Sequence, residues 1–337
     1  MNWFTSYLSF RQQCVAIIGI TSGLVSINIG VPQGSVLGPI LFLIYIYDLT
    51  QYITNGQCNI FADDNIIYTN GKSLPEVNTK LQLAVNQVDI WYKENKLNVN
   101  ADKCDTILVT SHHRQINHGL NITIDGTKIN QSSSVKYLGI TVTNTLNWNP
   151  HIITNICAKI RPIIAMINRM KKWLPASVLQ TMYTSYVQPH IDYGITVWGN
   201  SPAASIYNLQ RQQNLMARII TNNFDYINQR GSDILKDLGL YNIKQRYNYL
   251  LSCLTYKCLH NLAPTVLCNC LNKLSDINEH PLRTNTLYNL AIPRIRTNKL
   301  KEAFFINAPY VWNNLPLELQ MADSIACFKC NYKMLMN

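Results

Sequence analysis

The chain has 337 residues, of which 47% are hydrophobic and 14% charged, a composition typical of a folded protein with a sizeable core and not of a disordered chain. Its longest uninterrupted apolar run, residues 40–47, is far shorter than the roughly 20 residues that a membrane-spanning helix needs. The first 14 residues lack a basic segment followed by an apolar one, so we expect no signal peptide and an intracellular protein of the nucleus or cytoplasm.

Charge is divided unevenly along the chain. Residues 1–150 carry nine Lys or Arg and nine Asp or Glu, whereas residues 151–337 carry 20 and nine, so the whole net charge of +11 lies in the second half. This asymmetry favours a polyanionic partner for that half, because each Lys or Arg placed on a phosphate releases counterions. A basic, solvated surface is the alternative.

The ten cysteines are scattered through the chain, and without a secretion signal we expect them to be reduced thiols. The tightest group is Cys253, Cys258, Cys268 and Cys270, with His260 nearby. Its spacings do not repeat a paired C-x2-C pattern, so buried thiols are favoured and a zinc site is the alternative.

The first elements in chain order are a hairpin, a loop and a helix. Residues 14–20 and 25–29 are rich in β-formers, and the Thr21-Ser22-Gly23 segment between them predicts the turn. Residues 30–39, GVPQGSVLGP, predict a loop. The apolar residues that follow predict a buried helix that opens after Gly38 and Pro39.

Further along, Ser73-Leu-Pro-Glu76 is a capping-box pattern that predicts the start of a helix with one apolar face. Asp125-Gly126 predicts a second two-residue hairpin turn, and residues 135–142 predict a strand. From His151 onward, isoleucines recur at helical spacing over residues 152–167, which predicts a helix.

A second stripe, Leu209, Met216 and Ile220, predicts another helix, with Arg211 and Arg218 on its opposite side. The last 60 or so residues contain four prolines and are expected to be irregular. The chain therefore divides into a mixed first portion that ends near Thr143 and a mostly helical, basic second portion.

Residues 60–68, IFADDNIIY, predict a hairpin with Asp63 and Asp64 at its apex. Two unit charges about 4 Å apart repel by about 1 kcal/mol in water and about 4 kcal/mol at an effective dielectric near 20. An exposed pair is therefore cheap, and a half-buried pair needs a cation or a raised pKa. The apolar flanks favour half-burial and a divalent metal, while an exposed charged turn stays open as the alternative.

An ordered set of segments changes this balance. In family order and spacing, the chain resembles the reverse transcriptase of non-LTR (LINE-type, jockey-like) retrotransposons in five blocks: GVPQGSVLGPILFL (30–43), YIYDL (45–49), FADD (61–64), Trp91 with NKL (95–97) and Lys103, and YLG (137–139). The likeness continues into the region that follows the polymerase in these elements, through LNWNPH (146–151), DYG (192–194), VWG (197–199) and WNNLP (312–316).

The resemblance implies roles for particular residues. Asp63 and Asp64 match the palm-hairpin aspartates, the first being the principal metal ligand, so Mg²⁺ is the implied cofactor and a dNTP the implied substrate. Gln33 and Gly34 match the segment beside the templating base and incoming nucleotide, where glycine would let backbone approach closely. Lys103 matches a basic residue near the nucleotide phosphates. Residues 137–139 match the segment that supports the primer end.

Two departures from the family pattern are minor: Asn65 and Cys104 stand where the family usually has Thr. A larger one concerns the further carboxylate that a two-metal site needs. In the family it comes from a strand ahead of residues 3–11, and the only acidic residue before Asp63 is Asp48, which matches another position. We therefore expect an N-terminally truncated element that is catalytically incomplete by itself.

The resulting expectation is an α+β chain: a partial reverse transcriptase palm (residues 1–143, antiparallel sheet with helices), a helical thumb-like region (144–200) and a basic helical C-terminal domain (201–337). The implied function is RNA-directed DNA polymerisation by a two-metal mechanism, with RNA template and DNA primer as partners and no membrane. The alternatives are a non-catalytic nucleic-acid-binding remnant of a retroelement, and a genomic relic whose product is rarely made.

Overall fold

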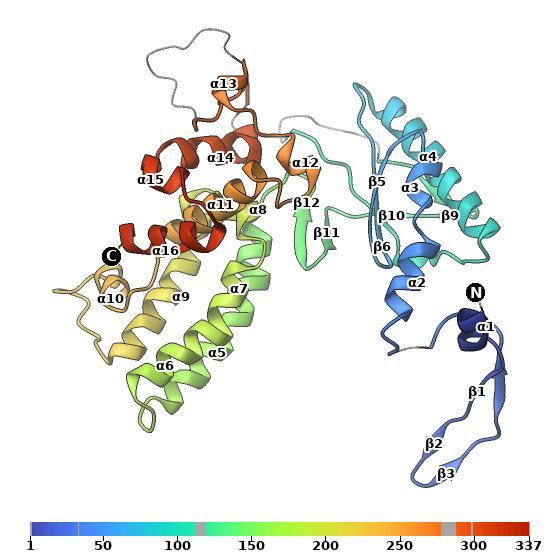
Figure 1. Cartoon of the computed structure of the whole chain (residues 1–337), viewed down its shortest axis with the longest axis horizontal. Coiled ribbons are helices and arrows are strands. Elements are labelled where there is room, and N and C mark those ends of the chain that lie inside the picture. Colours follow the sequence, from blue (N-terminus) through green and yellow to red (C-terminus); the bar gives the residue numbers. More distant parts are fainter. Residues whose placement is uncertain (1, 33, 112–118, 278–287, 298, 337) are drawn as a thin grey trace. The chain divides into compact units, whose positions relative to one another are not determined.

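The computed structural model describes residues 2–32, 34–111, 119–277, 288–297 and 299–336. The chain forms two compact units, residues 1–133 and 134–337 (Figure 1). Both combine helices with small two-stranded sheets, all but one of them antiparallel in the described residues, as expected for an α+β chain. In the part of the chain that the structure describes, no helix has the length and apolar character to cross a membrane.

The first unit holds the following elements in chain order: α1 (Asn2–Leu8), β1 (Arg11–Gln13), β2 (Ala16–Ile17), β3 (Ile20–Thr21), β4 (Val25–Ile27), α2 (Gly38–Tyr45), α3 (Leu49–Tyr52), β5 (Gln57–Phe61), β6 (Asp64–Tyr68), α4 (Leu74–Glu94), η1 (Ala101–Lys103), β7 (Asp105–Thr106), β8 (Thr123–Ile124), β9 (Thr127–Lys128) and β10 (Asn130–Gln131).

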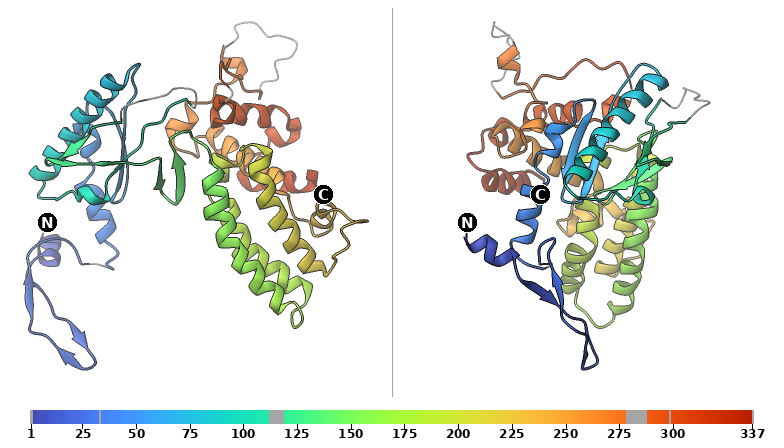
Figure 2. Two further views of the ribbon diagram at one scale, coloured as in Figure 1. Left: turned by 180° about the vertical axis from the view of Figure 1, so that it is seen from behind. Right: turned by 90° about the vertical axis from the view of Figure 1, so that its right-hand side faces the viewer.

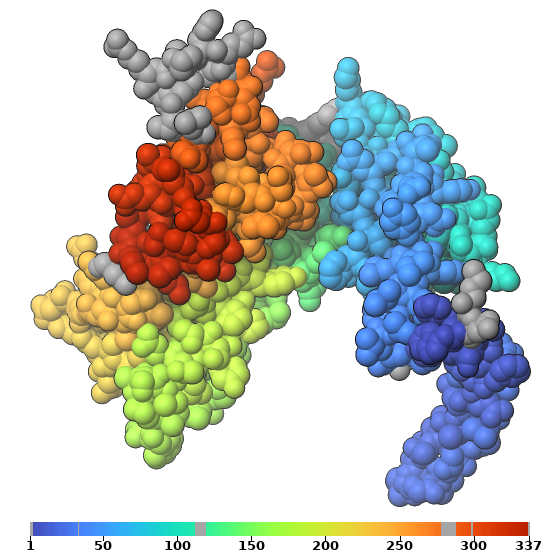
Figure 3. All heavy atoms as spheres, viewed as in Figure 1, coloured from blue at the N-terminus to red at the C-terminus, as the bar shows by residue number. Residues whose placement is uncertain are grey.

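The hairpin near the N-terminus turns at a different place from the one predicted. β1 pairs with β4 and β2 with β3, so that Ile17 faces Ile20 and the turn is Ile18-Gly19, not residues 21–23. Both turn residues have positive φ, +49° and +80°, which suits the twist of a two-residue hairpin. The β1–β4 hairpin projects as a narrow extension (Figure 3). Its apolar side chains, Ile18 among them, are largely exposed.

α4 organises the first unit. The helix begins after Ser73, whose Oγ accepts a hydrogen bond from the Glu76 N–H at 3.4 Å, as the capping pattern predicted. One face of α4 packs Val88 and Trp91 against α2, α3, β5 and β6. Another places Val85 in a second cluster with the residues around β8 and β9. α4 thus connects the 60–68 hairpin to the rest of the unit.

Two further predictions in the first unit are confirmed. α2 begins at Gly38 with Pro39 in its first turn. β8 and β9 form the hairpin predicted around Asp125-Gly126, with both turn residues at positive φ. β7 and β10 add the parallel pair.

The second unit holds β11 (Ser134–Tyr137), β12 (Ile140–Thr143), the π-helical η2 (His151–Cys157), α5 (Ala158–Met170), α6 (Ala176–Met182), the π-helical η3 (Tyr183–Val187), α7 (Gln188–Asp192), α8 (Ile195–Trp198), α9 (Ala203–Thr221), α10 (Gly231–Asp237), α11 (Ile243–Leu259), α12 (Thr265–Cys268), α13 (Leu274–Ile277), η4 (Lys299–Glu302), α14 (Phe304–Asn313), α15 (Leu317–Gln320) and α16 (Ile325–Met336).

The predicted strand over residues 135–142 is wrong: the segment is a hairpin. β11 and β12 pair with Tyr137 opposite Ile140, and the turn is Leu138-Gly139, with φ of +44° and +79°. A leucine at positive φ is unfavourable alone, so sequence preference favoured a continuous strand. Contacts from the helices, described below, hold this turn.

The predicted helical stripe is confirmed, and its isoleucines form the core of the second unit. Ile152, Ile160 and Ile167, from η2 and α5, are all 1% exposed or less. α5 packs beside α9 (Figure 2), whose Leu209 and Met216 are fully buried, as the second stripe predicted. Each such side chain stabilises the unit by about 1.5–3 kcal/mol relative to exposure.

The spacing predicted Arg218 on the side of α9 opposite the apolar stripe. In the structure this side chain is buried, with only 4% exposed. Its guanidinium donates to the carbonyls of Asn223 (3.3 Å), Asp225 (2.9 Å) and Gln229 (2.7 Å). It also stacks on the ring of Tyr226 at 4.2 Å. Backbone carbonyls thus solvate this buried cation and fold the loop after α9.

The C-terminal segment is helical over residues 304–336, apart from short turns, and not irregular as predicted. Pro309 lies inside α14, where proline usually costs about 3 kcal/mol. Burial of Trp312 against Phe328, with ring centroids 6.0 Å apart, offsets that cost. Asn313 of the WNNLP segment bonds both backbone groups of Leu290, at 2.8 and 2.9 Å. WNNLP is therefore part of the packing of the C-terminal region.

Candidate functional site

The apex of the 60–68 hairpin presents the two aspartates. β5 and β6 pair with Phe61 opposite Asp64, so Ala62 and Asp63 form the two-residue turn and Asp64 begins β6. Ala62 has φ of +52°, a left-handed conformation that costs a non-glycine residue about 1–2 kcal/mol. Asp63 and Asp64 are both exposed.

The half-burial of the aspartate pair that the apolar flanks predicted is wrong, because Asp63 and Asp64 are exposed and the flanks themselves bury little. Ile60 and Ile66 are only partly buried, and Phe61 is 61% exposed. Among the described residues, neither carboxylate has an ion-pair partner, and no group of three His, Cys, Asp or Glu side chains gathers that could hold a metal.

The donor set at the apex suits a hard divalent cation, because carboxylate oxygens are its preferred ligands. Two carboxylates leave most of the coordination positions of such an ion to water, substrate or further protein ligands. Asp63 and Asp64 therefore fit part of a magnesium site and not a closed, structural metal site.

The hairpin is fixed to α4 by a hydrogen bond that the sequence did not reveal. The Asn65 side-chain amide donates to the Tyr92 hydroxyl at 2.5 Å, next to Asp64. The other amide atom of Asn65, Oδ1, is buried and has no hydrogen-bond partner in the part of the chain that the structure describes. Burial raises the pKa of Tyr92, which keeps its hydroxyl protonated at neutral pH. The signal available in the sequence was a polar residue inside an apolar strand.

The remaining predicted site residues of the first unit do not join the aspartates through any hydrogen bond or ion pair in the described structure. Lys103 is exposed at the end of η1, a turn that the Asn100 side chain caps through the Asp102 N–H at 3.0 Å. Gly34 is exposed with φ of +78°, and a Cβ there would meet nothing within 4 Å, so its backbone conformation explains the glycine. Gln33 lies outside the described residues.

In the second unit, two side chains hold the Leu138-Gly139 turn of the YLG segment, and a third holds the strand after it. The Tyr193 hydroxyl donates to the Leu138 carbonyl at 2.6 Å, and the Asn155 amide donates to the Gly139 carbonyl at 3.2 Å. The Thr141 N–H donates to Nδ1 of His151 at 3.3 Å. Burial, with Lys159 nearby, lowers the pKa of His151 and so favours the neutral imidazole, in which Nδ1 can accept this hydrogen bond.

The DYG segment (192–194) supplies Tyr193 and fixes it to the helices of the second unit. Asp192 accepts two hydrogen bonds from the Arg246 guanidinium, at 2.7 and 2.6 Å, which fixes the end of α7 to α11. Gly194 has φ of +63°, and a Cβ there would lie 2.6 Å from Cδ1 of Ile140. DYG thus positions the 138–139 turn on the helices, a role that its sequence alone did not suggest.

Comparisons with known proteins agree on one family. Residues 2–142 match the family described as Reverse transcriptase (RNA-dependent DNA polymerase). The chain is 27% identical over 259 residues to the RNA-directed DNA polymerase from mobile element jockey of Drosophila melanogaster, covering 72% of this chain and 28% of that protein. It is 28% identical over 255 residues to the probable RNA-directed DNA polymerase from transposon BS of the same species, covering 72% and 27%.

A third relative is the Retrovirus-related Pol polyprotein from type-1 retrotransposable element R1 of Bradysia coprophila, 32% identical over 178 residues, or 50% of this chain and 17% of that protein. The chain therefore spans little more than a quarter of the length of the first two relatives. The similarity to the jockey protein covers 72% of the chain, more residues than the 2–142 segment contains. It therefore extends into the helical second unit.

Proposed function

We propose that the chain supplies part of a centre that copies RNA into DNA in a non-LTR retrotransposon, because residues 2–142 match the reverse transcriptase family and the curated relatives come from such elements. The family in general uses a divalent metal, a dNTP substrate and an RNA template with a DNA primer. The observation that carries the proposal is the hairpin apex. It has two adjacent exposed carboxylates, neither of which forms an ion pair within the described ranges, and a hydrogen bond fixes the strand beside them.

In this proposal, Asp63 and Asp64 hold the divalent metal, which when bound neutralises charge on the reacting phosphates. Lys103 contacts the phosphates of the dNTP, and Gln33 with Gly34 borders the templating base. The reaction is attack of the primer 3′-hydroxyl on the α-phosphate of the dNTP, with release of pyrophosphate. The chain's own contribution is to orient these groups from separate elements of one unit.

The Leu138-Gly139 turn supports the primer end in the same proposal, and Tyr193, Asn155 and His151 position it. We also propose the division into a palm (residues 1–143), a thumb-like region (144–200) and a basic C-terminal domain (201–337). The first compact unit ends at residue 133, so the 138–139 turn belongs to the second unit. In this proposal, residues 155 and 193 of the thumb-like region hold it.

A primer-extension assay tests this function. Two-metal transfer needs a further carboxylate beside Asp63 and Asp64, and among the described residues no third His, Cys, Asp or Glu gathers with them, so we propose that the chain alone does not extend a primer. Purified chain with Mg²⁺, primed RNA template and dNTPs should give no product. Extension that is lost in Asp63→Ala would overturn the incompleteness and leave the catalytic role intact, whereas extension that survives in Asp63→Ala would overturn both.

A second candidate function is non-catalytic nucleic-acid binding by a retroelement remnant. The excess of 20 basic over nine acidic residues in residues 151–337 favours it. On this alternative, primer–template binding by the full chain falls steeply with salt, is not strengthened by Mg²⁺, and is not weakened by Asp63→Asn. A Mg²⁺-dependent gain in affinity that disappears in Asp63→Asn would instead favour the polymerase centre.

A further inference from the structure

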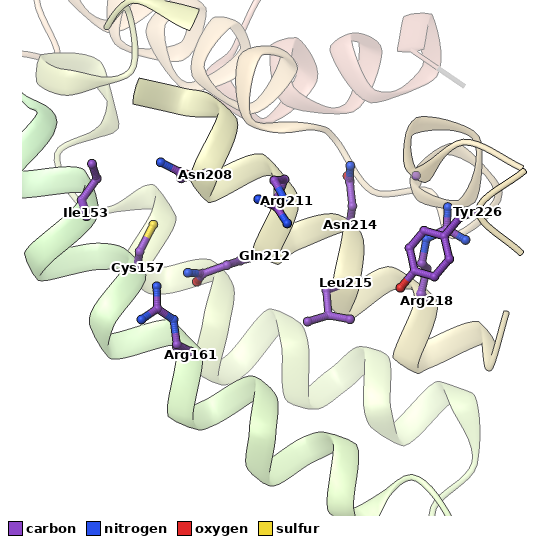
Figure 4. Close-up of a pocket in the computed structure, with 11 residues that line it drawn as sticks. Ile153, Cys157, Arg161, Asn208, Arg211, Gln212, Asn214, Leu215, Arg218 and Tyr226 are labelled. Carbon is purple, nitrogen blue, oxygen red and sulfur yellow. The ribbon is translucent and has the colours of Figure 1, made fainter. Parts of the chain in front are cut away.

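A groove in the second unit lies along one side of α9, between that helix and the η2–α5 segment (Figure 4). Its volume is about 720 Å³. Ligand-binding pockets typically measure about 300–1,000 Å³. Ile153, Cys157 and Leu215 give it an apolar part. The remaining side chains that line it are arginines, amides and one tyrosine: Arg161, Arg211, Arg218, Asn208, Gln212, Asn214 and Tyr226.

The charge of the groove is of one sign. No acidic residue is among those that line it, and Arg161 and Arg211 are exposed, without an ion-pair partner in the described part of the chain. Arg218 adds its positive field but is held by backbone carbonyls. Two guanidinium groups on neighbouring helices are thus available to an anion, and guanidinium favours phosphate because it can donate two parallel hydrogen bonds.

The groove also holds an unused acceptor. Oε1 of Gln212 is buried and has no hydrogen-bond partner among the described residues, although an unsatisfied buried polar atom costs about 1–3 kcal/mol. Gln212 comes from α9 and points, like Arg161 of α5, into the space between the two helices (Figure 4). A ligand with both phosphates and a hydrogen-bond donor would satisfy all three side chains.

We propose that this groove binds a nucleic-acid strand, with phosphates on Arg161 and Arg211 and a donor of the nucleotide on Oε1 of Gln212. A base N–H or amino group in RNA or DNA is such a donor, and the ribose 2′-hydroxyl is a further one in RNA. The inference deepens the partner assignment of the proposed function, on which it rests only for the choice of polyanion. It does not involve the aspartate hairpin.

Binding of fluorescein-labelled single strands to the full chain tests this site, with RNA and DNA of one sequence as separate arms. The double variant Arg161→Gln/Arg211→Gln should weaken both arms by at least about tenfold, and the slope of log K against log salt should become shallower by about 1.4, since each phosphate contact on a single strand contributes about 0.7. Arg161→Lys/Arg211→Lys should recover much of the affinity, because it keeps the charge.

The matched control is Arg169→Gln/Arg294→Gln, which removes two exposed arginines outside the groove. It should leave the affinity within about twofold of the wild type. Equal losses in the two double variants, or no loss in either, would overturn the proposal, since the binding would then be general charge attraction or lie elsewhere.

Gln212→Leu tests the donor contact. It should weaken RNA binding about fivefold or more; a loss confined to RNA assigns the donor to the 2′-hydroxyl, and an equal loss with DNA assigns it to a base. Unchanged binding in both arms would refute the Gln212 contact. These affinities are measured without Mg²⁺ or dNTP and therefore do not depend on the aspartate hairpin, so failure of the catalytic proposal is distinguishable from failure of this site.

Discussion

Removal of the Tyr92 hydroxyl should loosen the aspartate hairpin while leaving its apolar packing intact. Tyr92→Phe deletes the acceptor of the 2.5 Å hydrogen bond from Asn65, whose Oδ1 is already unpartnered. The whole buried amide is then unsatisfied, which costs about 1–3 kcal/mol. We expect the free energy of local opening of β5–β6 to fall by this amount. The opening equilibrium constant rises about tenfold for each 1.4 kcal/mol.

Amide hydrogen exchange of residues 57–68 measures this opening, because the β5–β6 amides report on the hairpin and not on the whole chain. Exchange should be about five- to 140-fold faster in Tyr92→Phe. A double-mutant cycle with Asn65→Ala should give a coupling near 1 kcal/mol. Unchanged exchange, or additive effects of the two substitutions, would show that this hydrogen bond does not hold the hairpin.

Three other predictions concern the second unit and the 30–39 loop. Burial lowers the pKa of His151 below 6.5, so the stability it contributes is fully present above pH 6.5 and lost as the pH falls toward its folded pKa; urea unfolding should show this loss, and His151→Gln should reduce it. Tyr193→Phe removes the hydrogen bond to the Leu138 carbonyl, so the opening free energy at the Tyr137–Ile140 amides should fall by about 1 kcal/mol and their exchange should become about fivefold faster; unchanged exchange would mean that the hydroxyl does not hold the turn. Gly34→Ala should lower the free energy of unfolding by about 1 kcal/mol because of its positive φ, and an unchanged value would contradict that backbone assignment.

Periodicity predicted the helices well, because burial on one face leaves a direct mark on the sequence. The isoleucines of residues 152–167 and the capped start of α4 both follow from local rules. The Asp125-Gly126 turn was equally predictable, since both of its residues adopt positive φ readily.

One turn was predicted at the wrong residues and another was missed inside a predicted strand, because neither has a sequence typical of a turn. Ile18-Gly19 and Leu138-Gly139 each place a large apolar residue at positive φ, where its own preference argues for a strand. At the second turn, the compensating contact comes from Tyr193, 55 residues away. Sequence patterns of short range do not contain that information.

The candidate site was predictable in part for the same reason. The aspartates at a hairpin apex follow from the strand pattern on either side. The Asn65–Tyr92 hydrogen bond and the burial of Arg218 do not, because each joins a polar group to a partner that only the folded chain brings near. Residues that position a site are thus harder to find from sequence than the residues they position.

The metal-binding role of Asp63 and Asp64 is the central claim, and a Mn²⁺ titration followed by methyl NMR tests it most directly. Mn²⁺ broadens signals near its binding site, and the Ile60, Ile66 and Ile67 methyl groups lie on the hairpin itself. We predict selective broadening of these methyls that disappears in Asp63→Asn/Asp64→Asn and persists in the control Asp102→Asn. Absence of selective broadening, or broadening that survives in the double variant, would contradict the account.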